Sequence, residues 1–311
     1  MPNNNKNVPP AWTKFAIAGI GGFSGWMFVH PFDVLKVRMQ INEGKNISAI
    51  RAFSQIYRME GIKGMYSGLS AAAARQFSYT TSRLGLYDVF TSKLIHSKNK
   101  NNNNNNQKSP HHLSIGEKLL CGLSAGGIAA TVCCPVEVAL VRMQADGVAA
   151  PELRRGYKNV FDAIYKTASN EGIATLWRGV VPTVTRGAVV SMTQLASYDQ
   201  FKEMLLDYNI IKHEGTLLHL SASVCAGFVY CIASLPLDIT KTRMQNQLPL
   251  ADGTFKYTSI GDALLKIPRQ EGLFALWKGF PAYFARGGGH TVMMFLFVEK
   301  YRAFVNHLYE D

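Results

Sequence analysis

The sequence lacks the short motifs that mark the common classes of enzymes and pumps. It contains no G-x-x-x-x-G-K-[ST] loop, so nothing in it indicates a pump driven by ATP hydrolysis. It also contains no G-x-S-x-G elbow and no H-E-x-x-H pair, which excludes two frequent hydrolase designs. We therefore expect a protein that is not an enzyme.

Cysteine is scarce and is placed unfavourably for a disulfide framework or a metal site. The count is five, an odd number, and no two cysteines form a C-x-x-C pair. All lie inside apolar stretches, at Cys121, Cys133, Cys134, Cys225 and Cys231. We expect buried, reduced thiols, and we predict no metal site and no cofactor.

Acidic residues are outnumbered by basic ones, 21 to 33, which gives a net charge of +12 at pH 7. An excess of basic residues can serve nucleic acid, an anionic membrane or an anionic solute. No basic helix with interleaved aromatic residues occurs, so we do not expect nucleic acid. The segment Met1–Pro10 has one Lys and no Arg, unlike a secretory signal or an Arg-rich transit peptide. Any targeting information is then internal.

One ten-residue phrase occurs three times. It starts with a proline at the end of an apolar stretch, carries an acid two residues later and an arginine seven residues later, and ends in Met-Gln. The three copies are Pro31–Gln40, Pro135–Gln144 and Pro236–Gln245, with starts 104 and 101 residues apart. This pattern indicates three related units of about 100 residues.

Each phrase follows an uncharged run of 18 residues or more, which is long enough for a membrane span. These runs are Phe15–Phe32, Leu119–Val136 and Gly215–Leu237, and their glycines allow close helix packing. A second phrase, E-G-x-x-x-x-[WY]-x-G, then precedes another long helix. We expect these second helices over Gly68–Leu94, Gly179–Leu206 and Gly279–Val305. We also expect short amphipathic helices between the two phrases, over Ser48–Met59, Tyr157–Asn170 and Tyr257–Gln270.

The predicted fold class is thus an all-α membrane protein, with six transmembrane helices as three αα repeats in pseudo-threefold symmetry and three short helices on one side. We place a disordered tail at 1–11, repeats at 12–96, 113–208 and 215–306, and an Asn-rich linker at 97–112. The linker contains six consecutive asparagines, which predicts disorder without a function of its own. Each segment from the start of the first phrase to the end of the second holds six Lys or Arg, which marks one membrane side. Both termini then lie on the other side.

An arginine recurs inside each second helix, seven residues beyond the last glycine of the second phrase. These arginines are Arg75, Arg186 and Arg286. An arginine inside a membrane is costly and indicates function. Around a threefold axis the three would point into a shared cavity and bind an anion. The alternative is a structural role, in which they bond neighbouring carbonyls or carboxylates.

Differences between the units are informative because a small solute has no threefold symmetry. Arg75, Tyr79 and Arg83 are four residues apart and share one helix face. The positions equivalent to Tyr79 hold Val190 and His290, and those equivalent to Arg83 hold Gln194 and Met294. We count Gln194 and His290 among the candidate substrate-binding residues. Arg83 is therefore a unique cation, and two or more fixed cations suit a dicarboxylate. His290 is either a polar donor to the substrate or a packed side chain.

Charges near the helix ends suggest gates. Acids follow the three prolines at Asp33, Glu137 and Asp238, with bases one turn later at Lys36 and Lys241. Unit two has Leu140 in place of the base, so one of three possible pairs should be missing. The opposite helix ends carry Asp88, Asp199, Lys202, Glu299 and Arg302, and Thr91 replaces the base in unit one. Interfacial charges that extend to the membrane surface are the alternative interpretation.

The threefold P-x-[DE]-x-x-[KR]-x-[KR]-x-Q phrase, followed by E-G-x-x-x-x-[WY]-x-G, resembles the mitochondrial carrier family over about residues 12–305. Leu140 departs from this pattern. The resemblance implies a six-helix bundle that opens alternately to the cytosol and the matrix across the mitochondrial inner membrane, with both termini in the intermembrane space. The resemblance implies a matrix network of ion pairs at Asp33, Lys36, Glu137, Asp238 and Lys241, braced by Gln40, Gln144 and Gln245. It implies a cytoplasmic network at Asp88, Asp199, Lys202, Glu299 and Arg302. It also implies substrate contacts at Arg83, Arg186–Gly187 and Arg286. The departures at Leu140 and Thr91 imply that both networks are weaker barriers, so that the two open states interconvert more easily or the protein leaks.

Within this family the chain looks most like the members that exchange 2-oxoglutarate for malate. The similar stretches are Tyr79–Tyr87, Ala145–Gly147, Arg154–Phe161 and Gln194–Tyr198. The resemblance implies electroneutral exchange of dicarboxylates by a protein that works as a monomer, with cardiolipin as a bound lipid. A dicarboxylate/phosphate exchanger and an uncoupling-type proton-leak protein are the alternatives, since they share much of this arginine pattern.

Overall fold

The computed structural model describes residues 11–42, 47–103, 113–149, 154–208, 216–249 and 254–310. All regular secondary structure in these ranges is helical, which confirms the predicted all-α class. Six helices are long: α1 (Ala11–Ile41), α3 (Leu69–Asn103), α4 (Ile115–Ala145), α6 (Val180–Asp207), α7 (Thr216–Asn246) and α9 (Phe280–Glu310). Three are short: α2 (Ala49–Met65), α5 (Val160–Glu171) and α8 (Ile260–Glu271). Single 3-10 turns complete the chain at η1 (Asp146–Val148), η3 (Ile173–Trp177) and η4 (Leu273–Trp277).

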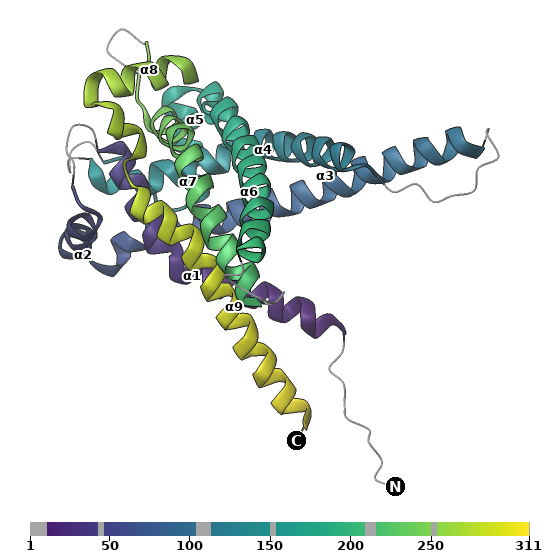
Figure 1. The fold of residues 1–311 in the computed structure, drawn as a ribbon. Helices are drawn as coiled ribbons and strands as arrows, with labels where there is room; N and C mark the ends of the chain where they lie inside the picture. The colour runs from purple at the N-terminus through teal and green to yellow at the C-terminus, as the bar shows by residue number, and fades with distance from the viewer. Residues whose placement is uncertain are drawn as a thin grey trace.

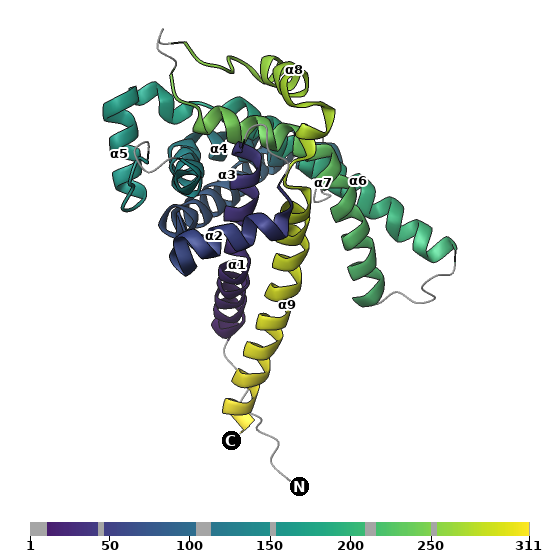
Figure 2. The ribbon, with the colours of Figure 1, turned by 90° about the vertical axis from the view of Figure 1, so that its left-hand side faces the viewer.

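The long helices form three arms, and each arm joins two units. The second helix of one unit packs along the first helix of the next, as α3 with α4, α6 with α7 and α9 with α1. The arms diverge from a common end, where the short helices lie (Figures 1 and 2). We call this end the junction and the opposite ends the arm tips. The start of α1 and the end of α9 lie at the tip of the same arm.

The packed core lies at the junction, where each first helix contacts a short helix. Leu35 of α1 clusters with Ile56 and Met65 of α2, and Ala139 of α4 clusters with Val160 and Ala163 of α5. In the third unit Ile239 of α7 meets Ala263 and Ile267 of α8, which repeats the same packing. Burial of these side chains attaches each short helix to the first helix of its own unit, and Val37 of α1 packs against Val141 of α4 across two units.

Capping residues set the starts of the short helices. The side chains of Asn159 and Ser259 accept hydrogen bonds from the backbone of Asp162 and Asp262, so helices α5 and α8 begin at Val160 and Ile260. Our predicted starts at Tyr157 and Tyr257 were three residues too early, because both tyrosines precede the cap.

Glycines make the turns near the two ends of the second phrase. Gly172 and Gly179 have φ angles of 88° and 95°, which only glycine adopts at low cost. A Cβ atom on Gly179 would also lie 2.7 Å from the side chain of Gln245, so this turn sits directly against the next unit.

Helix α3 continues to Asn103, beyond the end that we predicted at Leu94. Its last turns enter the segment that we expected to be a linker, of which residues 104–112 lie outside the described ranges. No proline or glycine interrupts the helix after Leu94. Lys98 also forms an ion pair with Glu117 of α4, with 2.6 Å between Nζ and Oε1. This pair fixes the extended part of α3 to its partner in the arm.

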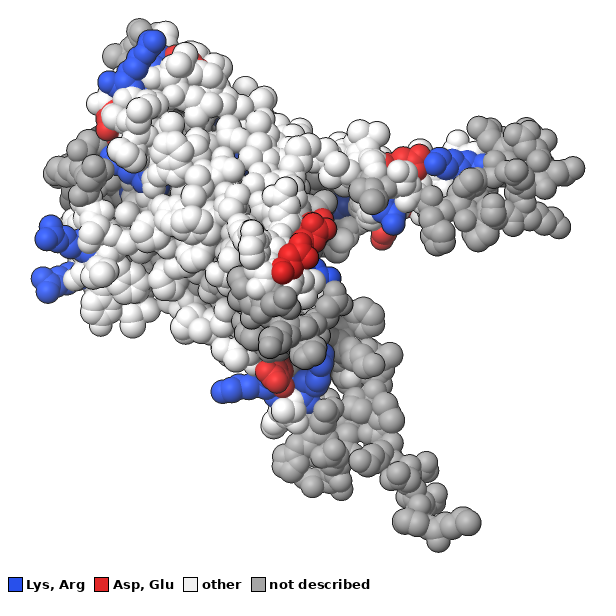
Figure 3. Space-filling model, in the orientation of Figure 1, with Lys and Arg blue, Asp and Glu red and all other residues white. Residues whose placement is uncertain are grey.

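The surface of the arms is apolar between charged ends. Lys and Arg side chains gather at the junction and near the arm tips, with few charges between them (Figure 3). Of the described helices, α4 and α7 contain segments apolar and long enough to span a membrane by themselves, Gly116–Val148 and Ser221–Asn246. In the described parts of the four other long helices, α1, α3, α6 and α9, no such segment occurs. The five cysteines are free, and Cys225 alone among them is only half-buried.

Candidate functional site

A cavity of about 330 Å³ opens between α3, α4 and α6. Arg75, Tyr79 and Arg83 of α3 line one wall, and Arg186 and Gly187 of α6 line the other. The cavity therefore brings together five of the eight predicted substrate-binding residues. Helix α4 contributes small residues such as Gly122 and Gly126, which leave the space open.

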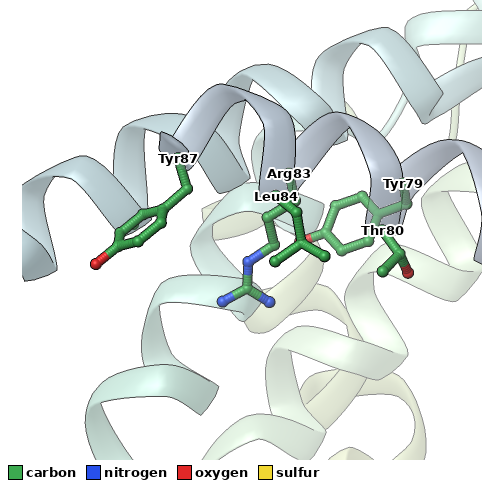
Figure 4. A pocket seen from close by; sticks show the side chains of 6 residues that line it. Tyr79, Thr80, Arg83, Leu84 and Tyr87 are labelled. Atoms are coloured by element: carbon green, nitrogen blue, oxygen red, sulfur yellow. The ribbon is translucent and has the colours of Figure 1, made fainter. Parts of the chain in front are cut away.

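Arg83 reaches out of α3 between two tyrosines. A groove of about 320 Å³ continues the cavity along α3 and contains Tyr79, Arg83 and Tyr87. The guanidinium of Arg83 points away from its own helix, and the ring of Tyr79 lies beside it (Figure 4). The guanidinium groups of Arg75 and Arg83 form no hydrogen bond or ion pair with any residue in the described ranges. They are available for a ligand with negative charge.

Three predicted residues lie elsewhere. Arg286 lines a second, smaller cavity of about 90 Å³ nearer the junction, which it shares with Arg75 and Arg186. Gln194 is exposed on α6 and His290 is half-buried on α9, and neither lines the two cavities. His290 and Gln194 were predicted because they occupy positions equivalent to Tyr79 and Arg83 in the other units. The arms diverge, so these equivalent positions do not meet at the cavity that contains Arg83.

Acids at the junction face two of the three recurring arginines. Nε of Arg286 lies 3.3 Å from Oδ1 of Asp33, and Nε of Arg186 lies 3.7 Å from Oδ1 of Asp238. Both Nε atoms are buried and have no hydrogen-bond partner within the described ranges, so these contacts are purely electrostatic. The geometry therefore fits both interpretations of these arginines, which are binding of an anionic ligand and bonding to neighbouring carboxylates.

Ion pairs join the units at the floor of the small cavity. Nζ of Lys36 lies 2.5 Å from Oδ2 of Asp238, and Nζ of Lys241 lies 2.8 Å from Oε2 of Glu137. All four side chains are at most 10% exposed. Buried pairs of this kind hold strongly because separating them would leave unpaired charges. The third position holds Leu140, which lines the same cavity.

The three glutamines expected to brace these pairs differ in the hydrogen bonds that their side-chain amides form. The amide of Gln40 donates to Oδ2 of Asp238 at 2.7 Å and accepts a hydrogen bond from the hydroxyl of Thr242 at 2.9 Å. The side-chain amide of Gln245 is buried without a hydrogen-bond partner within the described ranges. No hydrogen bond in those ranges involves the side-chain amide of Gln144, whose main-chain oxygen accepts instead from Arg38. Only one brace of three is formed in this conformation.

Tyr283 contacts three of the cations that line these cavities, Lys36, Arg186 and Arg286. Its ring lies under two cations, with its centroid 4.5 Å from Nζ of Lys36 and 5.2 Å from Cζ of Arg286. Its hydroxyl is 3.2 Å from Oγ of Ser234 and accepts a hydrogen bond of 3.5 Å from Arg186. Tyr283 is 1% exposed, so its ring is a fixed platform for these cations. Sequence reasoning missed it, although Ala72 and Thr183 at the equivalent positions mark it as specific to unit three.

A second set of ion pairs was also missed, between the arginine of the first phrase and the glutamate of the second. Arg38 binds both carboxylate oxygens of Glu60, at 2.5 and 2.8 Å. Arg142 and Glu171, and Arg243 and Glu271, form the same two-bond contact. The recurrence of both residues in all three units was the signal that could have revealed these pairs. They attach each short helix to its long helix.

The carboxyl group of Glu271, in the third of these pairs, has a lowered pKa. Burial alone would raise the pKa of Glu271, but hydrogen bonds from Arg243 and Lys278 outweigh it and lower the pKa to about 2. Glu271 thus stays ionised at any pH at which the protein works, and the contact between α7 and α8 keeps its charge.

The residues predicted to form an outer network lie apart at the arm tips. Asp88 is on α3, Asp199 and Lys202 on α6, and Glu299 and Arg302 on α9. Within the described ranges, no ion pair joins any two of Asp88, Asp199, Glu299 and Arg302. Contacts within an arm occur instead, with 3.0 Å between Oγ of Ser24 and the Tyr301 hydroxyl. The conformation is closed at the junction and open at the arm tips.

Comparison with known proteins gives a consistent result. The family model "Mitochondrial carrier protein" matches residues 7–98, 111–209 and 212–308. A mitochondrial 2-oxoglutarate/malate carrier protein of Mus musculus is 44% identical over 94% of this chain and 90% of its own length. One of Caenorhabditis elegans is 40% identical, covering 96% and 95%. A mitochondrial dicarboxylate/tricarboxylate transporter of Arabidopsis thaliana is 36% identical, covering 98% of both chains. With three matching repeats along its whole length, the chain belongs to the mitochondrial carrier family.

Proposed function

We propose that this chain exchanges 2-oxoglutarate for malate, or related dicarboxylates, across the mitochondrial inner membrane. The observation that carries the proposal is the pair of guanidinium groups of Arg75 and Arg83, which face one cavity and form no ion pair within the described ranges. The one acid that lines this cavity, Glu137, is already paired with Lys241. Arg186 adds a third cation on the opposite wall. Relatives named 2-oxoglutarate/malate carriers match almost the entire chain, which supports this substrate class.

The geometry suits an acid with two carboxylates. Guanidinium groups bind carboxylates through two parallel hydrogen bonds, and cations on two helices can hold the two ends of one short molecule. Tyr79 lies beside Arg83 and offers a hydroxyl that can donate to an oxo or hydroxyl group of the substrate (Figure 4). Both 2-oxoglutarate and malate are dianions at neutral pH, so one-for-one exchange moves no net charge.

Transport would follow from alternate opening of the two ends. We assign the Lys36–Asp238 and Lys241–Glu137 pairs, with Gln40, Gln144 and Gln245, to a gate on the matrix side. We assign Asp88, Asp199, Lys202, Glu299 and Arg302 to a gate on the cytoplasmic side. The conformation described above then corresponds to a carrier open to the cytosol. A substrate drives the change only to the extent that it binds the two states differently.

The remaining features follow the same proposal. The start of α1 and the end of α9 lie at one arm tip, which supports a topology with both termini in the intermembrane space if the junction faces the matrix. The repeats at 12–96, 113–208 and 215–306 would each supply one third of a monomeric carrier.

A groove of about 650 Å³ at the junction, lined by Lys63, Arg154 and Lys158, offers positive charge to an anionic lipid such as cardiolipin.

Uptake into liposomes tests the proposal. Purified protein should take up labelled 2-oxoglutarate only when malate or 2-oxoglutarate is inside the vesicles. Equal uptake into empty vesicles would exclude exchange. Strong competition by phosphate would favour a dicarboxylate/phosphate exchanger, and proton conductance activated by fatty acid would favour an uncoupling-type protein.

A further inference from the structure

The ion pairs at the junction follow a cyclic order that assigns a partner to every position. Lys36 of unit one pairs with the acid of unit three, Asp238, and Lys241 of unit three pairs with the acid of unit two, Glu137. By the same order, a base at position 140 of unit two would pair with Asp33 of unit one. Leu140 stands there, so the cycle leaves Asp33 without its regular partner.

Asp33 has a different cation within reach. Leu140, Asp33 and Arg286 line the same cavity of about 90 Å³, and Nε of Arg286 lies 3.3 Å from Oδ1 of Asp33. This contact is longer than the regular pairs, and its side chains are 31% and 19% exposed, whereas those of the regular pairs are at most 10% exposed. The contact is therefore the weakest of the three and the one most open to a competing anion.

Tyr283 holds Arg286 in this place. The ring lies beneath both the guanidinium of Arg286 and the ammonium of Lys36. It keeps Arg286 beside the regular pair of Lys36 and Asp238, at the boundary between the junction and the space lined by Arg75 and Arg186. Units one and two have no ring at this position, so only unit three offers an arginine fixed in this way.

We propose that Arg286 serves as the missing third base of the junction, so that Asp33 and a dicarboxylate substrate compete for one guanidinium. The inference rests on the proposed function for the chemistry of the ligand. When a substrate carboxylate takes Arg286, Asp33 has no other base to pair with because Leu140 is apolar. Substrate binding thus removes one contact between units one and three directly, while the two regular pairs stay intact.

The pair itself is tested without any substrate. A double-mutant cycle of Asp33→Asn and Arg286→Gln is measured by the thermal stability of the purified apo protein. Asp33→Asn should lower the Tm when Arg286 is present and leave it unchanged in the Arg286→Gln background, because a coupled pair gives a non-additive result. Additive changes in Tm would overturn the proposed pair. Because no ligand takes part, this result does not depend on which solute the protein carries.

Competition is tested by restoring the regular base. In Leu140→Lys the new ammonium takes Asp33 and releases Arg286, so the KM for 2-oxoglutarate in liposomes should fall about fivefold, as expected for loss of a competing ion pair of about 1 kcal/mol. The kcat should fall as well, since the junction then has three fixed pairs. In the Asp33→Asn background the same Lys should leave KM unchanged.

Two results would overturn the competition. One is an unchanged KM in Leu140→Lys, and the other is an equal fall of KM with Asp33 and with Asn at that position, which would be a general effect of added charge. Should 2-oxoglutarate not be carried at all, the proposed function fails, while the apo stability cycle still decides whether Arg286 pairs with Asp33.

Discussion

Nε of Arg38 donates a hydrogen bond of 3.1 Å to the main-chain oxygen of Gln144, in the last turn of the next unit's first helix. The same bond runs from Arg142 to Gln245 at 3.1 Å and from Arg243 to Gln40 at 2.9 Å. Together the three bonds close a ring around the junction. Each arginine uses its two terminal nitrogens on a glutamate of its own unit and its Nε on the neighbouring unit, a geometry that lysine cannot reproduce.

Arg142→Lys should therefore lower the stability of the folded protein although it keeps the charge. Arg142 is fully buried, and the shorter ammonium cannot reach Glu171 and the oxygen of Gln245 together. We expect a loss of about 2 kcal/mol, measured as a lower Tm of the purified protein. Arg154→Lys is the matched control, because Arg154 is exposed and makes only one 3.3 Å bond to Ala149. Equal Tm values for the two variants would contradict the prediction.

Arg83→Ala should abolish exchange of 2-oxoglutarate and leave the fold intact. Arg83 is exposed on α3 and has no acidic partner within the described ranges, so its removal breaks no contact that stabilises the protein. It removes a cation at the candidate site that no other unit supplies at the equivalent position. Uptake into malate-loaded liposomes measures the first effect, and the Tm measures the second. Uptake at the wild-type rate would show that the substrate site is misassigned.

Acid should destabilise the protein partly through Glu271. The pKa of this group is about 2 in the folded protein, below its ordinary value of 4.5. A lowered pKa contributes stability that is present above pH 4.5 and is lost as the pH falls towards 2. In Glu271→Gln the Tm should be lower at neutral pH and should depend less on pH between 4.5 and 2. Glu203→Gln, on the exposed face of α6, should follow the wild-type curve. A wild-type pH dependence in Glu271→Gln would refute this assignment.

The sequence predicted the elements of this fold better than their spacing in three dimensions. The repeated phrases located six long and three short helices, since proline, glycine and apolar runs act locally. The pairing of Arg38 with Glu60 escaped notice because it joins residues 22 apart, which no helical periodicity relates. Pseudo-threefold equivalence put His290 near Arg83, but equivalence fixes only a residue's place within its own unit. How far the arms diverge depends on contacts between units, which a single sequence does not reveal.

Tyr283→Phe and Tyr283→Leu should separate the role of the ring from that of the hydroxyl. The Phe variant keeps a platform for Lys36 and Arg286 and loses only the hydroxyl contacts to Ser234 and Arg186, at a cost of about 1 kcal/mol in stability. It should exchange 2-oxoglutarate with nearly the wild-type KM. The Leu variant removes the aromatic face, so the two cations lose their common support and KM should change severalfold while the protein still folds. Transport assays in liposomes give KM and kcat for both variants, and the Tm reports on folding. A larger change of KM in the Phe variant than in the Leu variant would assign the effect to the hydroxyl and would contradict the role of the ring.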